Sequence, residues 1–84
     1  MNAKQSKTLE AIFARPTRSD IAWADVESLF NALGATISEG KGSRVRISLQ
    51  EVKAAYHRPH PQREANKSTI DDVRAFLVSA GVTP

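Results

Sequence analysis

The spacing of hydrophobic residues changes partway along the chain, and this change limits the folds that are open to it. Up to Gly34 the hydrophobic residues recur at intervals of three and four, which is the period of an amphipathic helix. From Arg44 they alternate with polar residues, which is the period of a strand with one buried face. The helical period returns after Ser68. This order predicts an α+β fold with the element order α-α-β-β-β-α.

Two helices are predicted before the strands. The first covers 4–15 and ends before Pro16, because the residue that precedes a proline is pushed out of the helical region. A polar connector, 17–21, leads to a second helix over 23–33, which Gly34 ends as a C-terminal cap. Trp23 is expected to anchor this second helix in the core.

The last helix is predicted to follow a polar loop. The loop, 62–67, has basic residues but no apolar anchor, and we expect it to be mobile. Ser68 or Thr69 would cap the helix, with two aspartates in its first turn where the helix dipole favours negative charge. Gly81 would end it. The predicted inward stripe of this helix is Ile70, Val73, Phe76, Leu77 and Ala80.

Three strands are predicted, over 36–39, 44–49 and 52–57, and they would form an antiparallel sheet. If Gln50 and Glu51 form the tip of the second hairpin, all the inward pairs are apolar. These pairs are Leu49 with Val52, Ile47 with Ala54 and Val45 with Tyr56. The same register puts Arg44 opposite His57 and Ser48 opposite Lys53 on the other face. Gln-Glu is not a favoured two-residue turn, so a longer loop with another pairing stays open.

Length and charge give the broad class. The 84 residues predict one domain over 1–84, with 1–16 as a helical extension, and a core small enough that a homo-oligomer or a hetero-complex would help to stabilise it. Residues 40–67 hold seven basic and two acidic side chains, a net charge of +5, which leaves −2 for the rest of a chain whose total is +3. Such a cluster is typical of nucleic-acid binding, although a charged face kept for solubility is the alternative.

Several classes of protein are excluded. The chain has no cysteine, so disulfides and thiolate metal sites are ruled out. Two histidines without convergent carboxylates give too few ligands for zinc, and we expect no metal and no cofactor. No apolar run is long enough to act as a signal peptide or to span a membrane, so we expect a cytoplasmic protein with no membrane partner.

Four segments of the chain, in this order and spacing, resemble the HicA toxins of bacterial toxin-antitoxin pairs. They are Ala32-Leu33-Gly34, Gly40-Lys41-Gly42-Ser43-Arg44, Pro59-His60, and Ser68-Thr69-Ile70 through Ala80-Gly81-Val82. The resemblance runs from about Trp23 to Val82. It implies a fold like that of double-stranded-RNA-binding domains, in which helices pack on one face of a three-stranded sheet. It also implies cleavage of messenger RNA and silencing by a HicB-like antitoxin.

The sequence departs from the family at the catalytic position. The family signature is Gly-Ser-His with a catalytic histidine, whereas this chain has Gly42-Ser43-Arg44. Metal-free RNA cleavage needs a base and an acid, and the only imidazoles are those of His57 and His60. We therefore expect His57, opposite Arg44, to be the base and His60 to be the acid or a substrate contact. The alternatives are an exposed His57 without a task and a purely structural His60.

The basic side chains expected to bind RNA are Lys41, Arg44, Arg46, Lys53, Arg58, Arg63 and Lys67. Arg44 and Arg46 would track a phosphate backbone, unless they are simply exposed or pair with Glu39. Three interpretations are open: an endoribonuclease toxin, a non-catalytic RNA-binding or protein-interaction module in which Arg44 has replaced the base, and a structural partner of an acidic protein.

Overall fold

A computed structural model describes residues 1–84, the whole of the chain. Its elements are α1 (Ala3–Phe13), α2 (Trp23–Ala32), β1 (Thr36–Glu39), β2 (Arg44–Leu49), β3 (Val52–His57) and α3 (Lys67–Ser79). The predicted α+β class and the order α-α-β-β-β-α are confirmed.

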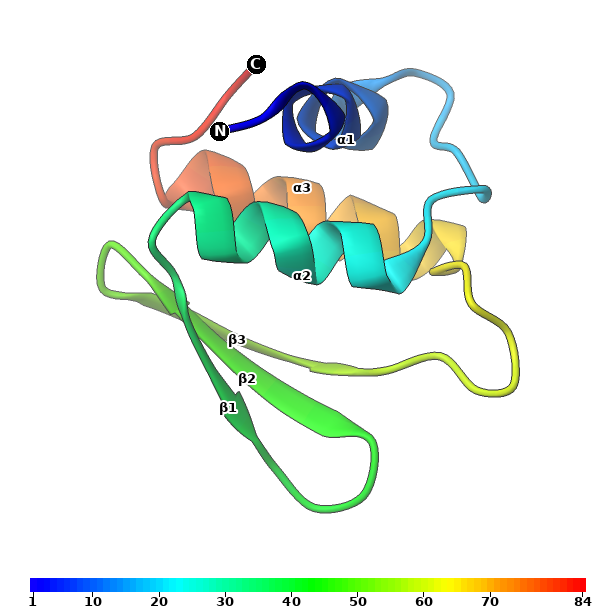
Figure 1. Cartoon of the computed structure of the whole chain (residues 1–84), viewed down its shortest axis with the longest axis vertical. Coiled ribbons are helices and arrows are strands. Elements are labelled where there is room, and N and C mark those ends of the chain that lie inside the picture. The colour runs from blue at the N-terminus through cyan, green and yellow to red at the C-terminus, as the bar shows by residue number, and fades with distance from the viewer.

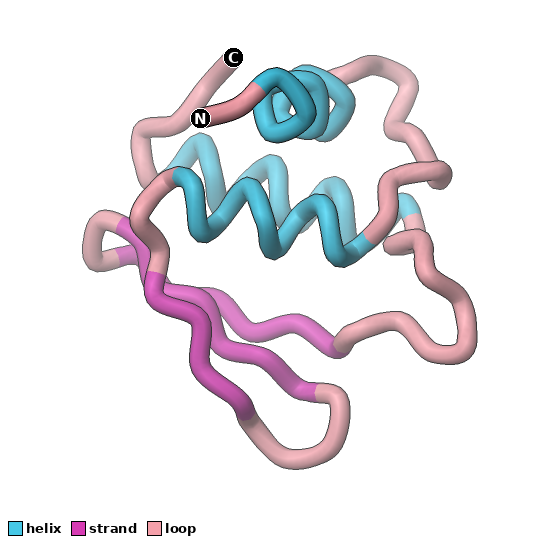
Figure 2. Tube along the Cα trace, viewed as in Figure 1, coloured by secondary structure: helices cyan, strands magenta, loops and turns pink.

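The elements form three layers, which Figure 1 shows from the side. The antiparallel sheet has the order β1-β2-β3 and lies at the bottom of the view. Helices α2 and α3 lie side by side over one face of the sheet, and α1 packs against both of them from the far side. Figure 2 shows the same arrangement by element type, with no helix below the strands. The helices therefore cover one face of the sheet, as predicted, and leave the other face open.

The predicted register of the second hairpin is confirmed at every pair. Val45 lies opposite Tyr56 among the inward pairs, and Arg44 lies opposite His57 on the open face. The tip residues Gln50 and Glu51 have φ values of 50° and 66°, as a tight hairpin turn with left-handed central residues requires. Neither residue type favours that region, so the apolar pairs along the strands outweigh the local preference of the turn.

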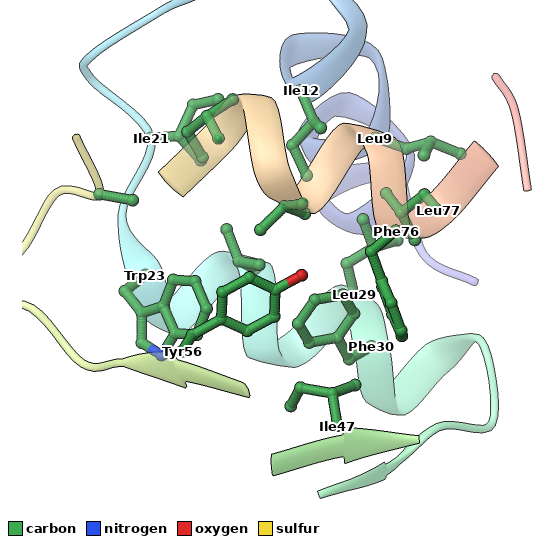
Figure 3. Close-up of a cluster of buried hydrophobic side chains, with 14 of the residues drawn as sticks. Leu9, Ile12, Ile21, Trp23, Leu29, Phe30, Ile47, Tyr56, Phe76 and Leu77 are labelled. Carbon is green, nitrogen blue, oxygen red and sulfur yellow. The ribbon is translucent and has the colours of Figure 1, made fainter. Parts of the chain in front are cut away.

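The core lies between the sheet and the helices, and four aromatic rings stand at its centre (Figure 3). Trp23 and Tyr56 have ring centroids 5.5 Å apart, and Phe30 and Phe76 meet edge to face at 5.8 Å. Trp23 is 4% exposed and Tyr56 is 8% exposed. The prediction that Trp23 anchors the second helix in the core is confirmed.

The predicted start of the last helix is wrong. The N-cap is Asn66, whose side chain accepts a hydrogen bond from the Thr69 backbone N–H at 2.8 Å, rather than Ser68 or Thr69. Because the helix begins at Lys67, its first turn contains no acidic residue. Asparagine is as good a cap as serine, and the polar run offered several residues that could fill this position. The inward stripe of five hydrophobic residues is buried as predicted.

The loop over 62–67 does have an apolar anchor, contrary to the sequence prediction. Ala65 is 2% exposed and its N–H donates to the Ile21 carbonyl at 2.9 Å. The Trp23 N–H donates to the Arg63 carbonyl at 2.9 Å, which completes a short bridge between two connectors. Ile21, which the sequence places in a polar connector, is 4% exposed and belongs to the core. These contacts hold the loop against the start of α2.

The N-terminal extension is part of the folded core. In α1, Ile12 is fully buried and Leu9 is 5% exposed. The side chain of Arg74 on α3 is buried as well, and its Nε donates to the Ile12 carbonyl at 2.9 Å. Its other nitrogens donate to Thr17 and Asp71 at 3.0 Å. One guanidinium therefore ties the end of α1 and its connector to α3.

A second arginine joins the sheet to α2. Arg58 follows β3 on the helix side of the sheet, and its Nε donates to the Glu27 carboxylate of α2 at 2.7 Å. The same carboxylate accepts a hydrogen bond from the Trp23 indole. Two further nitrogens of Arg58 donate to Glu39 of β1 at 2.6 and 2.9 Å. Arg58 thus joins both edges of the sheet to α2.

Replacing Ile12 with alanine should destabilise the whole domain, because the side chain is fully enclosed and its loss leaves a cavity. We expect a loss of about 2–5 kcal/mol in the free energy of unfolding. Glu10→Ala on the exposed side of the same helix should change it by about 0.5 kcal/mol or less. Urea denaturation of both variants measures the difference, and equal midpoints would show that α1 does not stabilise the core.

Arg58→Met should lower the melting temperature at pH 7, because it removes the hydrogen bonds of Arg58 to Glu27 and Glu39. Hydrogen bonds from Arg58 hold the pKa of Glu39 below its ordinary value of 4.5. A lowered carboxyl pKa stabilises the fold above that ordinary value, and the effect is lost as the pH falls through the lowered one. The gap between the native chain and the variant should therefore shrink from pH 7 to pH 3.

The control for this experiment is Arg46→Met, since Arg46 forms no ion pair. It should leave the melting temperature almost unchanged. Calorimetric scans of the three proteins at both pH values give the comparison. A gap of the same size at pH 3 and pH 7 would show that Arg58 acts through packing alone.

Candidate nucleic-acid interface

The open face of the sheet carries the polar side chains of all three strands. Alternation sends every second residue of each strand away from the helices. The residues on this outer face are Thr36, Ser38, Arg44, Arg46, Ser48, Lys53, Ala55 and His57. This outer face has no acidic side chain, so its net charge is positive. Three of its residues carry hydroxyl groups.

Three cations on the outer face have no carboxylate partner. Arg44, Arg46 and Lys53 are exposed, and none of them takes part in an ion pair. The one polar contact of Arg46 is with the Glu39 carbonyl at 3.4 Å. The predicted alternative, an ion pair with the Glu39 carboxylate, is not formed. These charges are free for an anionic ligand.

The cations surround a shallow hollow of about 470 Å³, which we call the face hollow. Its polar lining residues are Thr36, Ser38, Arg44, Arg46, Ser48 and Lys53. The three hydroxyl residues were not among the predicted site residues, although the alternation of the strands could have placed them. Guanidinium, ammonium and hydroxyl groups are the side chains that most often contact phosphate oxygens.

Gly40 makes room for Arg44 at the edge of the outer face. Its N–H donates to the Arg44 carbonyl at 2.8 Å, in continuation of the ladder between β1 and β2. A Cβ at Gly40 would lie 3.1 Å from the Cβ of Arg44 and 3.2 Å from its Cγ. A larger residue would therefore require the arginine side chain to shift by a few tenths of an ångström.

The two histidines line a second hollow, of about 460 Å³, beside β3. This edge hollow lies between β3, the loop after it and the start of α3, and we define it by Tyr56, His57, His60, Asn66, Thr69 and Asp72. His57 extends from the outer face opposite Arg44, and His60 stands in the loop between two prolines. The structure thus brings both predicted catalytic residues to one hollow.

The remaining basic residues of the predicted set lie apart from both hollows or are occupied. Lys41 is in the turn between β1 and β2, Arg63 is in the anchored loop, and Lys67 begins α3. All three are exposed and unpaired, but none lines either hollow. The guanidinium of Arg58 is bound to Glu27 and Glu39. Sequence alone could not reveal this pairing, because the three residues are distant along the chain.

Metal-ligating side chains do not gather anywhere on the chain. No three histidine, cysteine, aspartate or glutamate side chains come together in a group that could hold a metal ion. None of the helices combines the length and the apolar character that crossing a membrane requires.

Comparison with known families accounts for this architecture. The family model described as HicA toxin of bacterial toxin-antitoxin matches residues 23–82, more than half of the chain. The matched segment contains α2, the sheet, α3 and both hollows, and leaves out only α1, its connector and the last two residues. Searches of curated proteins and of solved structures returned no match. The match confirms the resemblance found in the sequence, and the chain belongs to the HicA toxin family.

Proposed function

We propose that this chain is an endoribonuclease toxin that binds messenger RNA on the outer face of its sheet. The observation that carries the proposal is the group of unpaired cations on that face with His57 directly opposite Arg44. Membership of the HicA toxin family supports the toxin role. A HicB-like antitoxin would silence the protein by covering this face.

Binding begins with the phosphates. Arg44, Arg46 and Lys53 replace the counterions of the RNA backbone, and the hydroxyls at the rim of the face hollow add hydrogen bonds. Lys41, Arg63 and Lys67 lie outside the hollow and would extend the contact along a longer RNA. Arg58 has a different part in the proposal, because two carboxylates already bind it. It holds the end of β3, next to His57, against Glu27 of α2 and Glu39 of β1.

Cleavage then needs one proton removed and one supplied. His57 takes the proton of a 2′-hydroxyl, and the resulting oxygen attacks the adjacent phosphorus. Arg44 and Arg46 stabilise the charge of the pentavalent phosphate. The bond to the 5′-oxygen breaks and that oxygen receives a proton, for which His60 in the edge hollow is the candidate donor. The products are a 2′,3′-cyclic phosphate and a 5′-hydroxyl, and no metal ion takes part.

One observation favours a second function. Arg44 occupies the position at which the family resemblance expects the catalytic histidine, and an arginine is a poor base because its guanidinium stays protonated. A chain that had lost cleavage would keep the cationic face and act as an RNA-binding module. The presence of His57 across the strand pair is the reason for preferring the nuclease.

Induced expression of the native chain should arrest bacterial growth, and His57→Ala should relieve the arrest. His57 is exposed on the strand, so its replacement should leave the fold intact. Loss of a general base lowers the rate about 10²–10⁴-fold. The purified proteins are compared by incubation with labelled RNA in a chelator, together with measurement of RNA binding.

Glu10→Ala, on the helix farthest from the sheet, is the matched control and should be as toxic as the native chain. Retained RNA binding by His57→Ala together with lost cleavage supports the catalytic role. A native chain that binds RNA but leaves both growth and RNA intact would overturn the nuclease and favour the binding module.

A further inference from the structure

The edge hollow contains polar groups that the proposed cleavage does not use. Asp72 lines it, is exposed, and takes part in no hydrogen bond or ion pair. Its neighbour in sequence, Asp71, is occupied by Thr17 and Arg74. Of these two adjacent aspartates, Asp71 is therefore hydrogen-bonded within the fold, whereas Asp72 lies at the wall of the hollow without a partner.

Tyr56 supplies a second unused group. The residue is 8% exposed and lines the hollow, yet its hydroxyl makes no hydrogen bond within the chain. The structure contains no fully enclosed polar side-chain atom without a partner, so this hydroxyl is not completely enclosed. Figure 3 shows it pointing away from its own strand toward the helices. Burial and the nearby charge of Asp72 raise the pKa of Tyr56, so the hydroxyl stays a hydrogen-bond donor.

The two hollows meet at one small residue. Ala55 lines both of them, between Lys53 and His57 on the outer face. A nucleotide whose phosphate lies among the cations of the face hollow could therefore turn its base over the edge of β3 at Ala55. A volume of about 460 Å³ lies within the range of small-molecule sites and is ample for one base.

We propose that the edge hollow binds one unpaired guanine of the RNA, with Tyr56 and Asp72 reading its Watson–Crick edge. The hydroxyl of Tyr56 donates to O6, and the carboxylate of Asp72 accepts from N1–H and N2–H. Guanine is the RNA base with two adjacent donors on this edge, so it is the one that a single carboxylate binds through two hydrogen bonds. Bases are read in this way when they are splayed out of a single strand.

This inference rests on the proposed RNA binding and adds a base preference to it. Adenine, cytosine and uracil each offer a carboxylate one donor at most beside acceptors, which would repel it. A matched bidentate contact is worth a discrimination of about tenfold or more. RNA held in this way would be cut next to guanine, within reach of His57.

The test uses pentanucleotides of 2′-O-methyl RNA, which lack the attacking hydroxyl and so cannot be cleaved. UUGUU, UUAUU, UUCUU and UUUUU are titrated into the whole chain, and binding is measured by fluorescence anisotropy. UUGUU should bind about tenfold more tightly than the other three. Tyr56→Phe, which removes only the hydroxyl, and Asp72→Asn should each reduce this ratio to about threefold or less.

Glu51→Gln, which neutralises an unpaired carboxylate at the hairpin tip, is the matched control and should keep the full preference. Equal affinities for the four sequences, or a preference that survives both variants, would overturn the guanine site while leaving the RNA face intact. If no pentanucleotide binds, the proposed RNA binding on the outer face is contradicted. Guanine binding in the edge hollow is then tested separately with the mononucleotide 5′-GMP. Amide shifts of Tyr56, Thr69 and Asp72 with 5′-GMP but not 5′-AMP support it, and no shifts overturn it.

Discussion

Six residue pairs fix β2 against β3, and the two faces of the sheet depend on this register. A shift of one residue would turn Arg44 and Arg46 toward the helices and bring Val45 and Ile47 to the surface. The cost of exposing these buried side chains holds the strands in place even though the turn at Gln50 and Glu51 adopts a conformation that neither residue favours. The cationic face and the core are therefore two consequences of one pairing.

The charged residues divide into two groups in the same structure. Arg58 and Arg74 are held by carboxylates and backbone groups, and each joins elements that are distant in sequence. Arg44, Arg46 and Lys53 have no carboxylate partner on the face that no helix covers. The distinction between structural and available cations separates the residues that build the domain from those that we propose to meet RNA. The extension beyond the matched family segment also has a structural role, because α1 is packed into the core.

Periodic features of the fold were predictable from the sequence, whereas contacts that depend on packing between distant segments were not. Alternation along 44–49 and 52–57 was enough to predict the register, the buried Tyr56 and the position of His57 beside Arg44.

The cap at Asn66 was missed because several neighbouring polar residues could serve equally well. The burial of Ile21 and Ala65 was missed because their contact joins two connectors without a repeating pattern. The edge hollow was missed for a similar reason, since β3 and α3 form it together only after the chain has folded.

The central claim is that three cations of the outer face bind the RNA backbone, and the salt dependence of binding tests it most directly. Each phosphate contact contributes about 0.7 to the slope of log K against log salt for a single strand. Replacing Arg44, Arg46 and Lys53 together with glutamine should therefore lower the slope by about 2. Lys7→Gln, an exposed cation on α1, should leave it unchanged. An unaltered slope in the triple variant would show that the RNA is bound elsewhere and would contradict the claim.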